Sequence, residues 1–224
     1  MYIPLLLLSV LLPVYIVFYF KFDKKRVLVL KMLTSTTFLA LGIIASNITT
    51  NRDYAILVMC GLCFGFIGDF LLGMQRVDRK HKKIYFLFGL LAFLIGHCFY
   101  ISAFSLESHI YAWVYLTVPV LMTLVGIFLL SRVNIKSLAI KCGNYLYLFI
   151  TAMLLTFGVG NLILDSSFLT LVCALGAIFF ALSDLLLFFL YFKNPKSRIK
   201  MLKTFNIVLY YSAQILLAYS IYLS

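Results

Sequence analysis

The sequence predicts an all-α polytopic membrane protein, and its composition is the first reason. Of its 224 residues, 64% are hydrophobic and 12% are charged, and the mean hydropathy is +1.09. Soluble domains are about half apolar and about a quarter charged, so this chain lacks the charge to cover a water-facing surface. Its apolar segments are continuous and lack the alternation of membrane β-strands. We therefore expect helices that use lipid as their solvent.

The lengths of the apolar segments give the second reason. A helix needs about 20 mostly apolar residues to cross a bilayer, and segments of that kind recur along the whole chain. We predict transmembrane helices at residues 2–20, 27–46, 54–74, 84–104, 111–130, 144–164, 167–192 and 205–222. Only short connections remain between them. The sequence therefore predicts eight crossings in one integral membrane domain over residues 1–224.

The placement of positive charge gives the third reason. Seventeen of the 19 Lys and Arg side chains fall in every second connection: Lys21, Lys24, Lys25 and Arg26; Arg76, Arg79, Lys80, Lys82 and Lys83; Arg132, Lys136 and Lys141; Lys193, Lys196, Arg198, Lys200 and Lys203. Cytoplasmic loops carry this excess of positive charge, so we expect both termini outside a cell (plasma) membrane, the inner membrane of a bacterium. Topology and anionic lipid headgroups account for the net charge of +12. We expect no nucleic-acid partner, because no aromatic–basic module accompanies the charge.

Four ionisable residues fall within the predicted helices: Lys31, Asp69, His97 and Asp184. An ionisable group at membrane depth costs about 3 kcal/mol or more, so each is a functional candidate. Asp69 shares a stripe of four-residue spacing with glycines on its helix, and such stripes allow close helix packing in lipid. Asp184 shares a face with small residues in the same way. We expect both carboxyl groups to point into the bundle.

Both aspartates precede the predicted cytoplasmic end of their helix by five to eight residues, which places them about 8–12 Å below that surface. Lys31 begins at a similar depth on a helix of opposite direction. Adding 115 to a residue number aligns Asp69 with Asp184 and the first four predicted helices with the last four. This correspondence favours a four-plus-four parallel repeat with its axis along the membrane normal.

Further polar side chains lie on inward-facing stripes or at the same end of the bundle. His97 and Tyr100 share one face, nearer the middle of the membrane, and Tyr145 opens the predicted sixth helix. Asn206, Tyr210 and Gln214 form a stripe of four-residue spacing on the last helix. Ser, Thr and Tyr side chains elsewhere are ordinary hydrogen-bonding contacts between helices.

An ordered set of short motifs resembles the YhhN-like lysoplasmalogenase family of membrane proteins. The motifs are Gly68-Asp69-x-Leu-Leu, Gly96-His97-x-x-Tyr100, Ser183-Asp184 and Tyr210-x-x-x-Gln214, and their order and spacing match over nearly the whole chain. Family members usually carry Lys-Pro in the second helix, whereas this chain reads Lys31-Met32. The missing proline changes the local helix shape around the lysine.

The resemblance implies hydrolysis of the alkenyl (vinyl) ether bond of a lysoplasmalogen, a lysophospholipid substrate within the membrane lipid. Acid–base catalysis then falls to Asp69 and Asp184, because a vinyl ether is cleaved by protonation of its β-carbon and capture of the oxocarbenium ion by water. Two carboxyl groups in a poorly hydrated pocket suit this division of roles. The substrate-binding or supporting residues are expected to be Lys31, His97, Tyr100, Tyr145, Ser183, Tyr210 and Gln214. Lys31 would bind the phosphate or tune an aspartate, and no cofactor is needed.

Two other functions use the same residues. A proton-coupled transporter of a small molecule or lipid would also carry buried Asp, Lys and His; against it, the polar residues gather at one depth and form no path across the bilayer. A metal-dependent hydrolase would take Asp69, His97 and Asp184 as ligands, but His97 lies at another depth. The CxxC spacing of Cys60 and Cys63 has no second pair to complete a zinc site. We therefore expect no metal.

Overall fold

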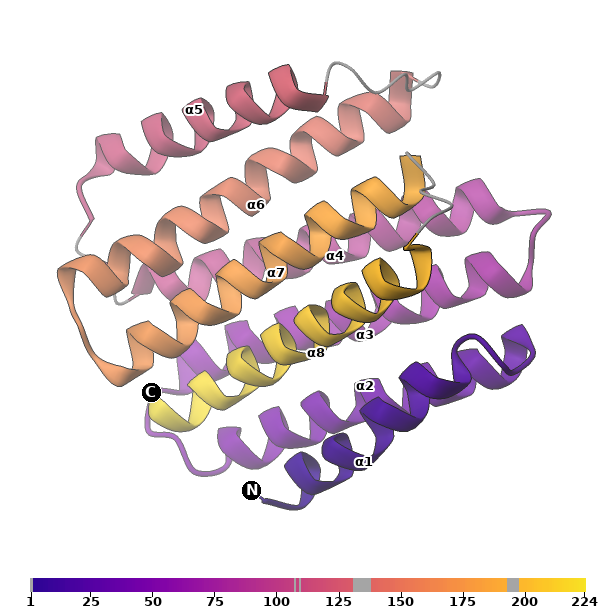
Figure 1. The fold of residues 1–224 in the computed structure, drawn as a ribbon. Helices are drawn as coiled ribbons and strands as arrows, with labels where there is room; N and C mark the ends of the chain where they lie inside the picture. The colour runs from indigo at the N-terminus through magenta and orange to yellow at the C-terminus, as the bar shows by residue number, and fades with distance from the viewer. Residues whose placement is uncertain (1, 107, 109, 131–137, 193–197) are drawn as a thin grey trace. The chain divides into compact units, whose positions relative to one another are not determined.

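The computed structural model describes residues 2–106, 108, 110–130, 138–192 and 198–224, where the regular secondary structure is all α-helix. The helices of this part are α1 (Tyr2–Phe18), α2 (Lys24–Ser46), α3 (Arg52–Val77), α4 (Lys82–Leu106), α5 (Ala112–Leu130), α6 (Leu138–Leu164), α7 (Phe168–Phe192) and α8 (Ile199–Leu223) (Figure 1). Four of the basic residues in the charge pattern lie outside the described residues, namely Arg132, Lys136, Lys193 and Lys196.

Helix length and hydropathy make the chain a polytopic membrane protein. Within the described residues, six helices are long and apolar enough to cross a bilayer, and they are α2, α3, α4, α6, α7 and α8. The apolar helices Tyr2–Phe18 and Trp113–Phe128 are shorter. The 17 residues of α1 extend about 26 Å, slightly less than the roughly 30 Å of a hydrocarbon core. The all-α polytopic class is thus confirmed.

Every predicted transmembrane segment corresponds to a helix, but two helices begin six residues earlier than expected. The α6 helix begins at Leu138 and not at residue 144, and α8 begins at Ile199 and not at residue 205. Hydropathy falls where lysines enter these segments, at Lys141, Lys200 and Lys203. Lysine is nevertheless a good helix former, so the helix continues through charged residues at which the apolar pattern stops.

The chain forms two compact units. Unit 1 comprises Met1–Tyr100 with Leu217–Ser224, and unit 2 comprises Ile101–Leu216. In unit 1, α1 packs against α2 and α2 packs against α3; in unit 2, α5 packs against α6 and α6 packs against α7. Successive helices therefore pack in the same order in both units.

Helix boundaries follow the 115-residue offset as well. Adding 115 to the bounds of α2, α3 and α4 gives 139–161, 167–192 and 197–221, which agree within three residues with the bounds of α6, α7 and α8. The correspondence is closest where the aspartates lie, because Asp69 and Asp184 each stand eight residues before the last residue of their helix.

Glycines on α3 allow its neighbours in unit 1 to approach closely. A Cβ added to Gly61 would lie 2.3 Å from the ring of Tyr100 on α4, and a Cβ added to Gly73 would lie 2.3 Å from Leu28 on α2. Asp69 lies between these two glycines on the same stripe and is 1% exposed. Close contact on both sides thus buries the carboxylate within the unit, as the stripe predicts.

Candidate functional site: a buried ion pair in unit 1

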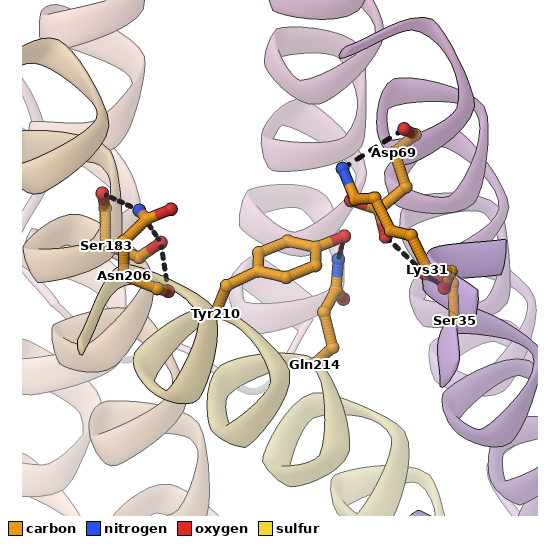
Figure 2. Close-up of polar contacts among 7 residues, drawn as sticks. All are labelled: Lys31, Ser35, Asp69, Ser183, Asn206, Tyr210 and Gln214. Carbon is orange, nitrogen blue, oxygen red and sulfur yellow. Dashed lines mark hydrogen bonds and ion pairs between the residues drawn. The ribbon is translucent and has the colours of Figure 1, made fainter. Parts of the chain in front are cut away.

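Asp69 is the centre of a buried polar cluster in unit 1. The Lys31 Nζ atom lies 2.9 Å from Asp69 Oδ1 and also donates to the Asp69 backbone carbonyl at 3.1 Å. The Ser35 hydroxyl donates to Asp69 Oδ2 at 2.6 Å, as Figure 2 shows. A cation and a hydroxyl thus occupy the two carboxylate oxygens.

The α2 helix places both partners of Asp69 on one face. Lys31 and Ser35 are four residues apart, so their side chains lie one above the other along the helix. Gly73 allows α2 and α3 to approach, and its added Cβ would lie 3.9 Å from Lys31 Cδ. Ser35 was not among the predicted site residues, although its spacing from Lys31 was a signal that could have identified it.

Two tyrosines of the same unit interact with Asp69, and His97 is buried with its ring bonded within its own helix. Tyr100 on α4 and Tyr15 on α1 are almost fully buried, and each interacts electrostatically with Asp69. His97 is 1% exposed, and its Nδ1 lies 2.6 Å from the carbonyl oxygen of Phe93. Because a carbonyl only accepts, Nδ1 carries the proton in this bond. The predicted residue Tyr100 thus interacts with Asp69, and so does Tyr15, from a helix in which we predicted no site residue.

Asp184 has a different partner in unit 2. A side-chain hydrogen bond joins it to Tyr147 on α6. Tyr147 was not predicted; the neighbouring candidate, Tyr145, instead presents its ring to Lys141, whose Nζ lies 5.9 Å from the ring centroid. Two helical positions differ by about 200° in direction, so Tyr145 and Tyr147 point to nearly opposite sides of α6. Choosing between them requires the rotation of the helix, which proximity in sequence does not give.

The remaining predicted residues of unit 2 form two local contacts, both visible in Figure 2. The Asn206 amide donates to the Ser183 backbone oxygen at 2.7 Å and to its hydroxyl at 3.0 Å, which joins α7 to α8. The Gln214 amide donates to the Tyr210 hydroxyl at 3.0 Å along α8. Asn206 therefore links Ser183, the neighbour of Asp184, to the polar stripe of the last helix.

These contacts define two carboxyl groups with unlike chemistry. Asp69 is paired with a cation and accepts a hydrogen bond from a serine hydroxyl, whereas Asp184 is partly buried and bonded to a phenol. Among the described residues, no group of three or more His, Cys, Asp or Glu side chains is placed to hold a metal ion.

Fold and site together define a polytopic α-helical membrane protein with an ion pair buried between two of its helices. Comparison with protein families gives the narrower assignment. The model of the YhhN family matches residues 27–221. The chain belongs to this family, as the ordered motifs predict. Neither the curated proteins nor the solved structures gave a match.

Proposed function

We propose that this protein hydrolyses the alkenyl ether bond of lysoplasmalogens, giving a fatty aldehyde and glycerophosphoethanolamine or glycerophosphocholine. Membership of the YhhN family supports the choice of reaction. The observation that carries the catalytic part is the buried ion pair of Lys31 and Asp69, with Nζ and Oδ1 2.9 Å apart. A buried charge in a lipid-embedded helix is costly. A hydrolase that activates water needs a base, and the Asp69 carboxylate can supply one.

The reaction needs one proton donor and one base. The donor protonates the β-carbon of the vinyl ether, and the resulting oxocarbenium ion is captured by water that has lost a proton to the base. The hemiacetal so formed gives its hydroxyl proton to the deprotonated donor. Its bond between carbon and the glycerol oxygen breaks as that oxygen takes the proton held by the base, which releases the aldehyde and restores both groups. One water is consumed, and no electrons are exchanged with a cofactor. Two carboxyl groups in opposite protonation states suffice for this chemistry.

The contacts of the two aspartates favour one division of roles. Lys31 places a cation and Ser35 a hydroxyl donor on the Asp69 carboxylate, so we assign the base to Asp69. Asp184 is instead bonded to a phenol, that of Tyr147. We assign the proton donor to Asp184, the second carboxyl group that the reaction needs.

Release of aldehyde by purified protein tests this function. Detergent-solubilised protein should convert lysoplasmalogens to aldehyde at an undiminished rate after exhaustive EDTA treatment, with a bell-shaped pH profile because acid and base must be in opposite states. Activity lost to EDTA and restored by zinc or manganese would favour the metal-dependent hydrolase. No aldehyde from any ether lipid, together with proton-driven uptake in proteoliposomes, would favour the transporter.

We also propose eight crossings of the cell membrane with both termini outside. The support is the distribution of Lys and Arg over alternate connections, which follows the positive-inside rule. Cysteines placed at Asn51 or Glu107 should react with an impermeant label in whole cells, and cysteines placed at Lys80 or Lys196 should not. Labelling of the Lys80 position from outside would invert this orientation.

A further inference from the structure

Arg76 differs from the other basic residues at its end of α3. The four that follow in the connection to α4 (Arg79, Lys80, Lys82 and Lys83) are exposed. Arg76 instead places its guanidinium carbon 4.0 Å from the centroid of the Tyr19 ring, and a side-chain hydrogen bond joins the two residues. Its Nη1 atom is buried and has no hydrogen-bond partner among the described residues. A buried donor of a guanidinium is costly to leave unpaired.

The nearest carboxylate in the sequence is already engaged. Asp78 accepts a hydrogen bond from His81 Nδ1 at 2.7 Å and another from the backbone of Lys80 at 3.1 Å. The bond from His81 holds the pKa of Asp78 below its ordinary value. Asp78 therefore binds groups of the turn between α3 and α4. It is not the acceptor that Arg76 Nη1 lacks.

Arg76 lies on the same side of α3 as Asp69. The two residues are seven positions apart, which is about two helical turns and about 10 Å along the axis. Tyr15, 3% exposed, interacts electrostatically with both of them and packs edge to face on Tyr19, with ring centroids 5.8 Å apart. Tyr15 thus interacts with both the carboxylate of Asp69 and the guanidinium of Arg76 within unit 1.

Lys31 does not serve as an anion site in this arrangement. Its ammonium group contacts both Oδ1 and the backbone oxygen of Asp69. A phosphate at Lys31 would compete with the carboxylate for the same donors. Of the two roles that the sequence left open for Lys31, the contacts favour tuning Asp69, and phosphate recognition requires another cation.

We propose that Arg76, held by Tyr19, binds the phosphate group of a lysophospholipid whose ether bond reaches Asp69. This inference rests on the proposed function and names the part of unit 1 that recognises the headgroup. A guanidinium offers paired donors that match phosphate oxygens, and a phosphate at Nη1 would satisfy its buried donor. Glycerol joins the phosphate to the ether oxygen through its short carbon chain, so a substrate can place one at the end of α3 and the other deeper in the helix. The ligand chemistry is a phosphate ester, carried by a lipid.

Binding of uncleavable ligands to the intact protein tests this site. A 1-O-alkyl lysophosphoethanolamine has no vinyl double bond to protonate, and 1-O-alkylglycerol also lacks the phosphate. Native mass spectrometry of detergent-solubilised protein gives the Kd of each. Arg76→Gln should raise the Kd of the phospholipid about tenfold or more, the effect of losing charged hydrogen bonds. The Kd of alkylglycerol should change less than about twofold.

Arg79→Gln is the matched control, because it removes an equal charge from the same end of α3 at an exposed position. It should leave both Kd values unchanged. Tyr19→Phe keeps the ring under the guanidinium and removes the hydroxyl, so it should weaken phospholipid binding by about two- to fivefold. If Arg76→Gln does not fold, Arg76→Lys carries the test, with weaker binding of the phospholipid alone expected, because Lys lacks the planar fork.

Three results would overturn the site. In the first, Arg76→Gln raises the Kd of both ligands equally. In the second, Arg76→Gln and Arg79→Gln raise the Kd of the phospholipid equally. In the third, neither change alters a Kd. Inorganic phosphate that displaces the lysolipid at comparable concentration would assign the site to free phosphate and overturn the lipid assignment. The reaction and the phosphate site can fail independently. Aldehyde release without selective phosphate binding overturns this site alone. Selective phosphate binding without aldehyde release overturns the reaction alone.

Discussion

The two halves of the chain present the same carboxylate to different partners. Asp69 and Asp184 are related by 115 residues and stand at the same distance from the ends of equivalent helices. At the positions that correspond to Lys31 and Ser35, the second half carries Leu146 and Ile150. The partner there is Tyr147, one position beyond the equivalent of Lys31. Equivalent helices therefore give their two carboxyl groups different neighbours, a cation with a hydroxyl in one half and a phenol in the other.

The largest effect should come from removing either carboxylate. Asp69→Asn and Asp184→Asn should each lower kcat for lysoplasmalogen by about 10²–10⁴-fold, because each removes a proton-transfer group without changing volume. Asp165→Asn, at an exposed position, is the control and should leave kcat unchanged. Losses below about threefold in both well-folded variants would give the two aspartates a structural role in packing helices.

Lys31→Met tests what distinguishes the first carboxylate. Without the ammonium group, the buried Asp69 carboxylate loses the cation that contacts its Oδ1. The pH profile of kcat/KM should then shift, and activity near neutrality should fall by about 10–100-fold, as expected for breaking a buried ion pair.

The same variant separates the two roles considered for Lys31. A rise in KM with an unchanged pH profile would mean that Lys31 binds phosphate, contrary to its observed contact with Asp69. Thermal unfolding followed by gel filtration provides the folding control. Adding Asp69→Asn to Lys31→Met removes the unpaired carboxylate and should restore part of the lost thermal stability without restoring activity.

Tyr147→Phe is the corresponding change in the second half, and its effect should be smaller. It removes one hydroxyl bonded to Asp184 and no charge, so we expect a loss of about five- to tenfold in kcat/KM, the size of one hydrogen bond. Tyr145→Phe is the control, because it removes a hydroxyl from the other side of α6. It should change kcat/KM less than about twofold. An equal loss in both variants would contradict the pairing of Tyr147 with Asp184.

Ser35→Ala should have the smallest effect. The Ser35 hydroxyl is one of two groups on the Asp69 carboxylate, and Lys31 remains when it is removed. We expect about a three- to fivefold loss in kcat/KM. Ser46→Ala removes a hydroxyl of the same helix that bonds only the carbonyl of Gly42 and should leave kcat/KM unchanged. A larger loss of kcat/KM for Ser35→Ala than for Lys31→Met would mean that the hydroxyl contributes more than the cation to the activity of Asp69.

Helices and inward-facing aspartates could be predicted because their causes are local. Lipid requires long apolar segments with internally satisfied backbones, so each helix appears in the sequence as a continuous run. Asp69 falls on a glycine stripe and Asp184 on a small-residue face, and these periodicities identify the buried face without any neighbour. The family motifs are local in the same sense, which is why the sequence predicted the YhhN assignment.

Partners of these residues were decided by tertiary structure. Lys31 and Asp69 are 38 positions apart, and whether their side chains meet depends on how α2 and α3 are rotated where Gly73 meets Leu28. The same rotation of a helix brings Tyr147, and not Tyr145, to Asp184. Arg76 is one of several basic residues at the end of α3, and the sequence treats them alike. Only the packing of α1, which places Tyr19 beneath its guanidinium, turns Arg76 inward, because side-chain direction at a helix end is set by the neighbouring helix.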